Sequence, residues 1–437
     1  MTNHINAFPG YEFVYFEKDK QYHNMFRGDD VGKGGFVYAV PGMYGNVATL
    51  DIISQHPNSI IALNYFGEYT PKYKELLDTR IAIKKGDFDT AKKMFDGRLE
   101  KYLQNKEDAA ALSQALKIAI NSFYGMTSAH YSNPCQNPRN QNNIVALRGA
   151  LFMRTLLDEV RDRGFVVAHI KTDSIKIPDA TPEIIQFCMD FAKKYSYQFE
   201  HESTYDKICL VNEAVFCSRY ASQEKCIELY GYVPGDNKKH PGEWTATGTQ
   251  FAVPYIFKSL FTREEIAFED LCETKSVKSA LYLDMNEALP DVSAEEKEYD
   301  KLMTKLCKLS PTDPAGDPIA KRIDELSPII EKGHDYRFVG RVGLFCPIKS
   351  GFGGGVLYRE SKTKGGAVSY AAVSGTSGYR WLESETVKDA GLEHHIDTSY
   401  FEKLKNEAEA SIREYGVVEW FTSDKPYDKD DNEILPF

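Results

Sequence analysis

Residues 165–178 read FVVAHIKTDSIKIP, and the rest of the fold can be worked out from this stretch. Two apolar runs, 165–170 and 175–177, flank the four residues Lys171-Thr-Asp-Ser174. Apolar runs joined by a short polar connection are typical of a β-hairpin. Gly164 ends the helical pattern before the hairpin, and Pro178 ends the hairpin itself.

Strand and helix patterns surround this hairpin in an order that predicts an α+β layered domain with a helical insertion. Upstream, 35–62 predicts two strands separated by a Pro/Gly turn, of which the second covers 47–52 and ends in a polar turn with Pro57. Apolar residues at helical spacing within 72–128 predict two long, roughly antiparallel helices that bracket a shorter one near 91–101. Further elements are predicted at 142–163 (helix), 182–194 (helix) and 207–215 (strand).

The 437 residues are enough for two or three domains, and 42% hydrophobic with 13% aromatic residues excludes a compositionally disordered chain. No apolar run approaches the roughly 18 residues of a membrane span, and the first residues lack the basic and apolar regions of a secretory signal. We therefore expect a cytoplasmic protein without a membrane partner. The eight cysteines form no CxxC pair or zinc-finger spacing, which predicts reduced core thiols.

A second domain is predicted from about residue 226, where acidic helical stretches at 263–300 and 315–332 alternate with Gly-rich turns. Twelve acidic and four basic residues in 263–300, with five acidic and two basic in 421–437, together account for the whole formal net charge of −11. The remainder of the chain is neutral, so the net charge does not exclude a nucleic-acid binder with a locally basic groove.

Two acidic residues stand at predicted strand ends. Asp51 closes an apolar strand, and Asp173 lies in the turn of the hairpin. Each alone is explained as a turn residue, but carboxylates on neighbouring strands are also typical of a two-metal site. Mg²⁺ suits such a site because it takes few protein ligands and leaves positions for phosphate oxygens.

The helical insertion carries polar residues four apart. Arg80 and Lys84 share one helix face, and Lys117 and Asn121 share another. Solvated helix faces explain each pair separately, whereas both pairs beside a carboxylate site indicate a triphosphate clamp. In the same stretch, Tyr124 is placed to stack on a base, and a glycine follows it that permits close approach of a base pair.

Three ordered motifs in this sequence resemble those of the family B (alpha-like) DNA polymerases, in the form found in tailed bacteriophages. They are Asp51-Ile-Ile-Ser-Gln-His-Pro-Asn-Ser59, Lys117-Ile-Ala-Ile-Asn-Ser-Phe-Tyr-Gly125 and Lys171-Thr-Asp-Ser174. A later segment, 212–220, ends in Ser-Arg-Tyr and is similar to the element with which the family grips the primer–template duplex.

The resemblance implies a right-hand polymerase with an antiparallel-sheet palm (1–70 and 129–225), two-helix fingers (71–128) and a mostly helical thumb with a C-terminal tail (226–437). It implies two Mg²⁺ ions, replaceable by Mn²⁺, on Asp51, Asp173 and the backbone carbonyl of Ile52. The residues that it implies for the incoming deoxynucleoside triphosphate are Ser54, His56, Arg80, Lys84, Lys117, Asn121 and Tyr124, and those for DNA are Gly125, Arg219 and Tyr220.

The sequence departs from the family pattern at three points. His56 stands where the family has a tyrosine under the incoming sugar, which leaves discrimination against ribonucleotides open. Lys171 replaces the first aspartate of the third motif, although Asp173 retains the liganding one. Only fifty residues precede Asp51, so no proofreading exonuclease is expected in this chain. An exonuclease-bearing subunit and a sliding clamp are therefore expected as partners.

The sequence thus predicts DNA-templated deoxynucleotide addition to a primer 3′ end by two-metal phosphoryl transfer in phage replication. Lys171 favours an alternative, a weakly active or inactive polymerase-like subunit of a replisome, and His56 favours a polymerase that accepts ribonucleotides.

Overall fold

The computed structural model describes residues 8–129, 131–136, 143–310, 313–362 and 368–425. The chain divides into two compact units, of which unit 1 is Met1–Gly248 with Ser411–Phe437 and unit 2 is Thr249–Ala410. Unit 2 therefore begins at residue 249 rather than near 226, and the chain returns to unit 1 after it. Among the described residues, no helix combines the length and apolarity that a membrane crossing requires.

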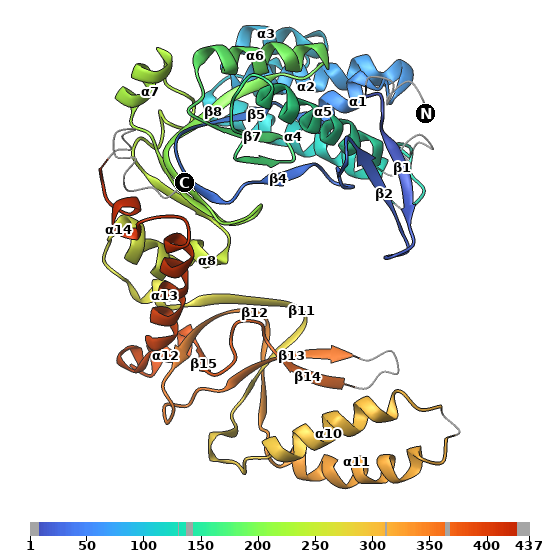
Figure 1. Ribbon diagram of the computed structural model, residues 1–437, viewed down its shortest axis with the longest axis vertical. Helices are drawn as coiled ribbons and strands as arrows, with labels where there is room; N and C mark the ends of the chain where they lie inside the picture. Colours follow the sequence, from blue (N-terminus) through green and yellow to red (C-terminus); the bar gives the residue numbers. More distant parts are fainter. Residues whose placement is uncertain (1–7, 130, 137–142, 311–312, 363–367, 426–437) are drawn as a thin grey trace. The chain divides into compact units, whose positions relative to one another are not determined.

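Unit 1 is built on a seven-stranded sheet whose paired strands are all antiparallel, in the order β10-β9-β8-β5-β7-β6-β4 (Figure 1). The predicted hairpin is confirmed, since β6 and β7 pair across a turn at Thr172 and Asp173. The strands are β4 (Val37–Ala39), β5 (Gly42–Ile52), β6 (His169–Lys171), β7 (Ser174–Pro178), β8 (Phe199–Leu210), β9 (Phe216–Tyr220) and β10 (Trp244–Thr247).

Alternation over residues 48–52 of β5 gives the sheet an apolar face and, at this end, a polar face, whereas Val47 belongs to a small apolar cluster on the second face. Ala48, Leu50 and Ile52 belong to the main core, whereas Thr49 and Asp51 alternate with them toward the opposite face. The apolar face packs against the two helices α5 (Ile144–Arg161) and α6 (Pro182–Lys194), both predicted from the sequence. The helix α5 is buried along almost its whole length, so it is the central support of the sheet.

The helical insertion has a core of its own. The helices are α1 (Gln55–Ala62), α2 (Thr70–Lys84), α3 (Phe88–Lys93) and α4 (Lys106–Thr127). Tyr73 near the start of α2 donates a hydrogen bond to the carbonyl of Ile120 near the end of α4 and contacts the Phe123 ring. The two long helices therefore run antiparallel, as predicted. The polar turn predicted around Pro57 is wrong, because this proline lies in the first turn of α1, where its missing amide hydrogen is not needed.

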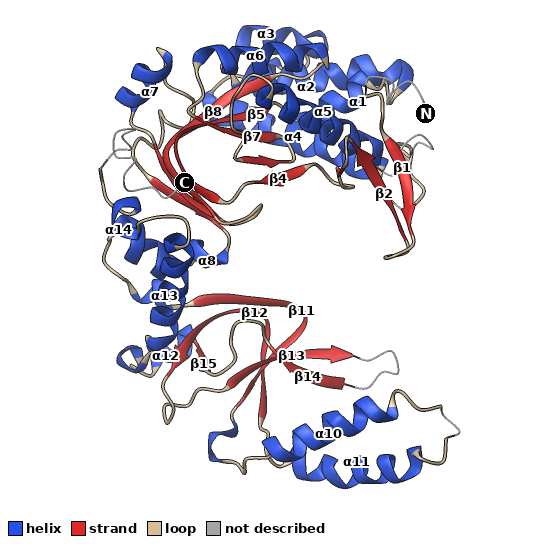
Figure 2. Cartoon of the chain, in the orientation of Figure 1, coloured by secondary structure: helices blue, strands red, loops and turns tan. Residues whose placement is uncertain are grey.

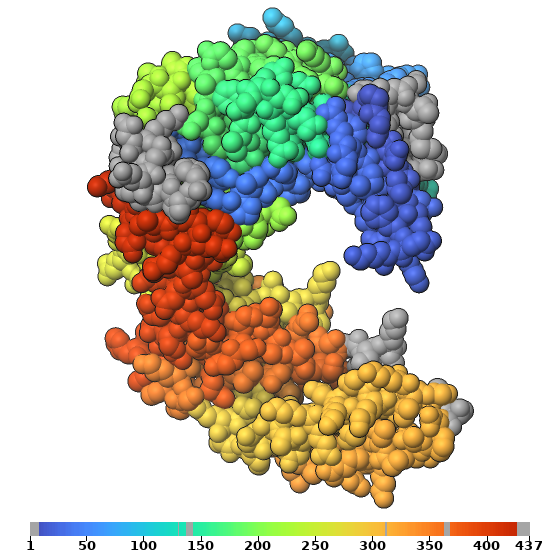
Figure 3. All heavy atoms as spheres, in the orientation of Figure 1, coloured from blue at the N-terminus to red at the C-terminus, as the bar shows by residue number. Residues whose placement is uncertain are grey.

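An N-terminal three-stranded sheet completes unit 1 and projects from it as a dark blue arm (Figures 1 and 3). Its strands are β1 (Glu12–Phe16), β2 (Gln21–Phe26) and β3 (Asp29–Asp30). The Phe13 and Tyr22 rings stack across β1 and β2 with centroids 4.7 Å apart, and both side chains remain partly exposed. Two short helices, α7 (Gln223–Tyr230) and α14 (Val418–Phe421), lie in the later parts of unit 1.

Unit 2 corrects the prediction of a mostly helical second part (Figure 2). Its core lies on a five-stranded antiparallel sheet in the order β14-β13-β11-β12-β15. The strands are β11 (Glu273–Asp284), β12 (Tyr336–Ile348), β13 (Val356–Lys362), β14 (Val368–Ala372) and β15 (Arg380–Glu383). The helices are α8 (Thr249–Ala252), α9 (Pro254–Phe257), α10 (Ser293–Leu306), α11 (Gly316–Glu331), α12 (Ser384–Asp389) and α13 (Ser399–Arg413), of which α13 ends in unit 1.

The acidic stretch 263–300 was predicted to be helical, but its centre is the strand β11. In β11 intermediate and exposed side chains alternate over the first residues, which is the period of a strand and not of a helix. The predicted helix at 315–332 is confirmed as α11. All eight thiols are free, and the expectation of core thiols fails for Cys307, which is exposed.

The packing of α1 on α5 yields a stability prediction at Gly149. A Cβ atom at this position would lie 2.5 Å from the Cδ atom of Gln55. Gln55 is buried and donates a hydrogen bond to the carbonyl of Thr172 in the hairpin turn. Gly149→Ala should therefore lower the free energy of unfolding by about 1–2 kcal/mol despite the better helix propensity of alanine.

Urea denaturation of Gly149→Ala measures this loss. The matched control is Gly125→Ala in α4, where an added Cβ atom meets nothing within 4 Å. This control should be neutral or stabilising by up to about 1 kcal/mol. Equal stability of the two alanine variants would contradict the assigned contact.

Candidate active site

The candidate site lies at the end of β5, on the polar face of the large sheet. Asp51 pairs with Ser174 of β7 on one side and with Glu200 of β8 on the other. Asp173 occupies the hairpin turn, and its carbonyl accepts a hydrogen bond of 2.9 Å from the amide of Ile52. Antiparallel pairing thus brings the two predicted metal ligands, Asp51 and Asp173, to the same edge of the site.

Two residues with positive φ shape this edge. Thr172 has φ 58°, and its amide donates a hydrogen bond of 3.0 Å to the carbonyl of Phe36. Ser54 has φ 56° and turns the chain from β5 into α1. Left-handed backbone is uncommon outside glycine and persists where surrounding contacts fix it, often at functional sites. The turn is therefore held in one conformation by its neighbours.

A cavity of about 530 Å³ opens at this place, between the end of the sheet and the helices α2 and α4. Nine of the residues that the sequence predicted line it, and they are Asp51, Ile52, Ser54, His56, Arg80, Lys84, Lys117, Asn121 and Asp173. The remaining four lie elsewhere. Tyr124 stacks on His56 from behind the lining, whereas Gly125, Arg219 and Tyr220 do not border the cavity.

The carboxylates of the site repel one another. Burial and the charges of Asp173, Glu202 and Glu200 raise the pKa of Asp51 to about 8. Burial also raises the pKa of Asp173 and of Glu202. Two buried, like-charged carboxyl groups resist ionising together unless a cation joins them. The site therefore favours a cationic ligand.

Lys176 supplies a counter-charge that acts on both Asp51 and Asp173. It lies on β7 with 6% of its surface exposed, and its ammonium group is 5.1 Å from the centre of the Phe216 ring. Burial lowers the pKa of Lys176 to about 8, although Glu202 and Asp51 act in the opposite direction. One lysine with a lowered pKa only partly balances the acidic group that surrounds it.

Sequence reasoning missed Lys176, Glu200 and Glu202. The last two belong to β8, which the prediction placed at 207–215 although it covers Phe199–Leu210. Phe199 belongs to the main core and Glu200 lines the cavity, but a register shift between β5 and β8 at Glu202 interrupts the alternation before Ser203. The period of two is therefore short and is carried mainly by polar residues, so the sequence offered only a weak strand signal here.

The opposite wall of the cavity is cationic. The Nε atom of Arg80 is buried and has no hydrogen-bond partner among the described residues, while its Nη1 atom lies 3.5 Å from the Ser54 hydroxyl. Lys84 forms an ion pair of 3.1 Å with Glu200, and both side chains are partly exposed. An unpaired guanidinium donor that faces a polar cavity points to an anionic ligand.

His56 and Tyr124 form an aromatic floor. Their ring centroids are 4.2 Å apart and their planes differ by 11°. Burial lowers the pKa of His56, so its imidazole is neutral near pH 7, and its Nε2 atom lacks a hydrogen-bond partner in the described part of the chain. A flat, stacked pair with one free polar atom can support a sugar or a base.

The donor set at Asp51 and Asp173 fits Mg²⁺. Among the described residues, no group of three or more His, Cys, Asp or Glu side chains is arranged to hold a metal ion. Two carboxylates and the nearby carbonyl of Ile52 form a smaller set of oxygen ligands. Mg²⁺ commonly binds through one or two carboxylates together with water and substrate phosphates, so the small set suits this ion.

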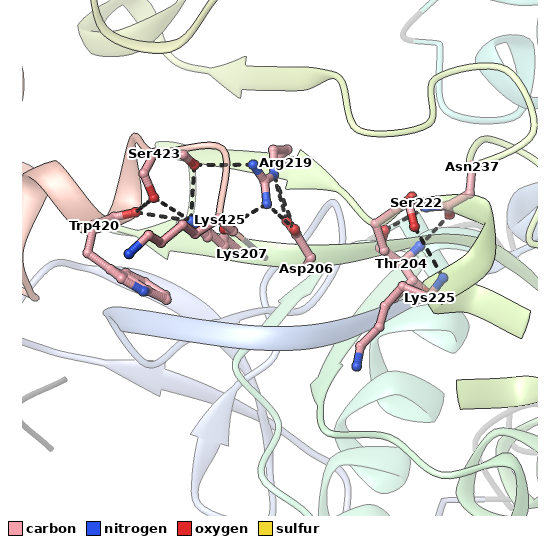
Figure 4. Close-up of polar contacts among 11 residues, drawn as sticks. Thr204, Asp206, Lys207, Arg219, Ser222, Lys225, Asn237, Trp420, Ser423 and Lys425 are labelled. Atoms are coloured by element: carbon pink, nitrogen blue, oxygen red, sulfur yellow. Dashed lines mark hydrogen bonds and ion pairs between the residues drawn. The ribbon is translucent and has the colours of Figure 1, made fainter. Parts of the chain in front are cut away.

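Arg219 has a different role from the predicted DNA contact (Figure 4). The residue is 6% exposed, and its guanidinium group binds the buried carboxylate of Asp206. It also donates hydrogen bonds of 3.1 and 3.0 Å to the carbonyls of Ser423 and Lys425. The neighbouring Lys207 donates to the carbonyls of Trp420 and Ser423.

The prediction for Arg219 is therefore corrected, because its donors fasten the C-terminal segment 420–425 to β8 and β9. Tyr220, the next residue, is half-buried, and its ring centroid lies 5.1 Å from that of Tyr205. Gly125 is exposed in α4, with open space around it. The tail after residue 425 lies outside the described residues.

Comparison of the sequence with protein-family models and with curated proteins finds no match. Among solved structures, the chain is similar to the family B DNA polymerase from the hyperthermophilic archaeon Pyrobaculum calidifontis, with a TM-score of 0.40 and 11% sequence identity. The similarity covers 86% of this chain and 46% of that polymerase, so the chain spans about half of its length.

The raised pKa of Asp51 predicts a pH-dependent stability. The protonated carboxyl contributes stability that is present below its ordinary pKa of 3.8 and is lost as the pH rises through about 8. Asp51→Asn removes the ionisable group, so without metal the variant should be more stable than the wild type near pH 9. After a discount for solvent screening, the difference is about 1–3 kcal/mol.

Thermal unfolding without metal from about pH 4 to pH 9 measures the difference, which should shrink toward the acidic end. Adding Mg²⁺ near pH 9 should stabilise the wild type and leave Asp51→Asn unchanged. Asp162→Asn, at an exposed carboxyl group, is the control and should follow the wild type. A pH-independent difference would refute the repulsion between the carboxylates.

The contacts of Arg219 predict a large loss of stability on truncation. Arg219→Ala leaves Asp206 buried without its partner, which should lower the free energy of unfolding by about 3–5 kcal/mol. Limited proteolysis should then cut within 418–425 faster than in the wild type. Lys239→Ala removes an exposed ion pair with Asp236 and should change stability by less than about 1 kcal/mol. If Arg219→Ala and Lys239→Ala changed stability and proteolysis to the same small extent, the internal role of Arg219 would be refuted, and the residue could contact DNA as predicted from the sequence.

Proposed function

We propose that this protein is a DNA-templated DNA polymerase, which adds deoxynucleotides to a primer 3′ end in bacteriophage DNA replication. The observation that carries the proposal is one cavity that holds both carboxylates and all four polar residues predicted for a triphosphate. These residues come from β5, the hairpin turn, α2 and α4, which are distant in sequence. Three separate sequence motifs and the helix α2 supply residues to this one cavity, so chance is a poor explanation of their convergence.

The phosphate-binding wall supports this chemistry through charge. Arg80, Lys84 and Lys117 would neutralise the triphosphate, and the Asn121 amide would donate to a phosphate oxygen. The unpaired Nε donor of Arg80 is available for this purpose without breaking an existing hydrogen bond. Lys84 would exchange its contact with Glu200 for a phosphate. Ser54 lies beside Arg80 at the same end of the cavity.

The carboxylate wall would hold the metal ions and place the primer terminus. Asp51 and Asp173, with the carbonyl of Ile52, would ligate Mg²⁺ or Mn²⁺. When bound, the two ions supply charge neutralisation for the attacking hydroxyl and for the pyrophosphate leaving group. Glu200 and Lys176 would adjust the charge at the edge of this set, since both act on Asp51.

The same assignment gives the parts of a right-hand polymerase. In it, the seven-stranded sheet is the palm, α2 and α4 are the fingers, and unit 2 is the thumb. His56 and Tyr124 would lie under the incoming sugar and base, and Gly125 and Tyr220 would lie near the DNA. An exonuclease subunit and a sliding clamp complete the proposal as partners in trans.

One observation favours the inactive polymerase-like subunit as a second candidate. Lys171 lies at the end of β6, opposite Ser174 and two residues before Asp173. It places a cation where the resembled family has an acid. Its side chain is exposed, so it can turn toward solvent and need not displace a metal ion. The first proposal therefore accommodates Lys171, but activity must be measured.

Single-turnover primer extension across a Mg²⁺ titration tests the proposal. Asp173→Ala should lower the rate by about 10³-fold or more, because it removes a direct ligand and half of the carboxylate pair. Lys171→Ala should lower it by about tenfold or less, because a charged lysine cannot bind Mg²⁺. Lys171→Asp should stay active with an altered Mg²⁺ dependence.

Lys239→Ala serves as the surface control, and the unfolding transition of every variant shows whether it is folded. A wild-type chain without extension activity would favour the inactive subunit. Equal losses in Lys171→Ala and Asp173→Ala would assign Lys171 a catalytic role. Competition between deoxynucleotides and ribonucleotides in the same assay tests the consequence of His56.

A further inference from the structure

Two cysteines face each other in unit 2, far along the chain from the site above. Cys272 directly precedes β11, and Cys346 lies in β12. The register pairs Glu273 with Phe345, so the next positions along the two strands are those of the cysteines. Opposed residues of antiparallel strands have Cα atoms about 4.5–5.5 Å apart. This range lies inside the roughly 4.4–6.8 Å that a disulfide spans.

The side chains also meet. The two Sγ atoms are 2.8 Å apart, and the Cys272 thiol lies 3.3 Å from the carbonyl of Phe268. Both residues are buried, with Cys346 at 0% and Cys272 at 5% exposure. Both cysteines belong to the hydrophobic core of unit 2. Since their Sγ atoms are already 2.8 Å apart, they need to approach only slightly to reach the bond length of a disulfide, about 2.05 Å.

We propose that Cys272 and Cys346 form a reactive dithiol, which a hydroperoxide oxidises to an intramolecular disulfide. This inference goes beyond the proposed polymerase activity and does not depend on it. The resulting bond would join the first residue before β11 to β12 and fix these two strands at one end of the sheet.

The reaction proceeds in two balanced steps. The thiolate of Cys272 attacks one oxygen of the hydroperoxide, the O–O bond breaks, and a sulfenic acid forms while an alcohol or water leaves with a proton. The Cys346 thiol then attacks the Cys272 sulfur, the S–O bond breaks and water leaves. The two thiols lose two electrons and two protons, and the hydroperoxide is reduced.

The surroundings assign the attacking role to Cys272. A hydrogen bond from Cys346 lowers the pKa of Cys272, and Lys388 acts in the same direction, whereas burial, Glu269 and Asp270 oppose this shift. The same contact raises the pKa of Cys346, so Cys346 is the resolving thiol. Lys388 and Glu269 form an exposed ion pair of 2.8 Å, which shows that this end of β11 lies close to the surface.

Other thiols of the chain lack this combination. Cys209 and Cys217 face each other across β8 and β9, but both are at 0% exposure, and burial raises the pKa of Cys217. Cys226 is also buried, and burial raises its pKa to about 11. Low pKa, partial access and a resolving partner together distinguish redox-active cysteines. Cys307 is exposed and can be oxidised independently, so the expectation for the Cys272–Cys346 pair is that it forms the first intramolecular disulfide.

The experiment treats the full-length protein with hydrogen peroxide at neutral pH and counts thiols over time. Besides any oxidation of the exposed Cys307, we expect the loss of two thiols per chain with a mass decrease of two hydrogen atoms, and recovery of both thiols with dithiothreitol. Digestion without reductant should release one cross-linked peptide that contains Cys272 and Cys346. This mapping uses the wild-type chain, so it does not depend on the folding of any variant.

Variants then separate the dithiol from general oxidation. Cys272→Ser and Cys346→Ser should each abolish the cross-linked peptide, whereas Cys226→Ser, at a buried thiol of unit 1, should leave it intact. A cross-link that maps to Cys209 and Cys217 would overturn the proposal. So would oxidation to sulfinic or sulfonic acid without any cross-link, or full retention of all thiols after treatment.

Discussion

The alternation of side chains over residues 48–52 of β5 is the constraint on which the rest of unit 1 depends. Ala48, Leu50 and Ile52 are almost completely buried, and their packing against α5 and α6 fixes the register of the strand. A shift of one residue would turn Asp51 into that core and Leu50 into the cavity. The free energy gained by burying the apolar face thus holds the carboxylate of Asp51 on the polar face, where neighbouring negative charges disfavour it.

The hairpin turn depends on the same packing through a short chain of contacts. Gln55 fills the space beside Gly149 of α5 and holds the carbonyl of Thr172. The turn residue Asp173 is in turn bonded to the amide of Ile52. These contacts link the positions of Asp51 and Asp173 to α5, although the two residues are neighbours only in space. A pair of like charges needs such support, because its own electrostatics would separate it.

The sequence correctly predicted those helices and strands that have a regular spacing of apolar residues within their own length. The hairpin, α5, α6 and α11 were recognised because their apolar periods and their Gly or Pro boundaries agree. The strand β8 was displaced and β11 was taken for a helix, because polar and charged side chains interrupt the apolar pattern of both strands. In both cases a partner strand distant in sequence supplies the missing stabilisation, and no local pattern reports it.

The functional residues follow the same division. The motifs located nine residues of one cavity, because spacing within a helix or strand is local information. Glu200, Glu202 and Lys176 were missed since their place depends on the pairing of β8 and β7 with β5.

Arg219 was predicted to contact DNA because of its motif. In the structure, its donors instead bind Asp206 and backbone carbonyls of the same chain. With Lys207, it binds the carbonyls of Trp420, Ser423 and Lys425 and so fixes the segment with which the chain returns from unit 2. At the other crossing, β10 pairs with β9, in register with Arg219 itself. One short stretch of β9 thus anchors both connections of unit 2 within unit 1. Because Arg219 holds segments that connect unit 1 to unit 2, the fold itself requires an arginine at this position. Ligand binding alone therefore cannot explain why the residue is an arginine.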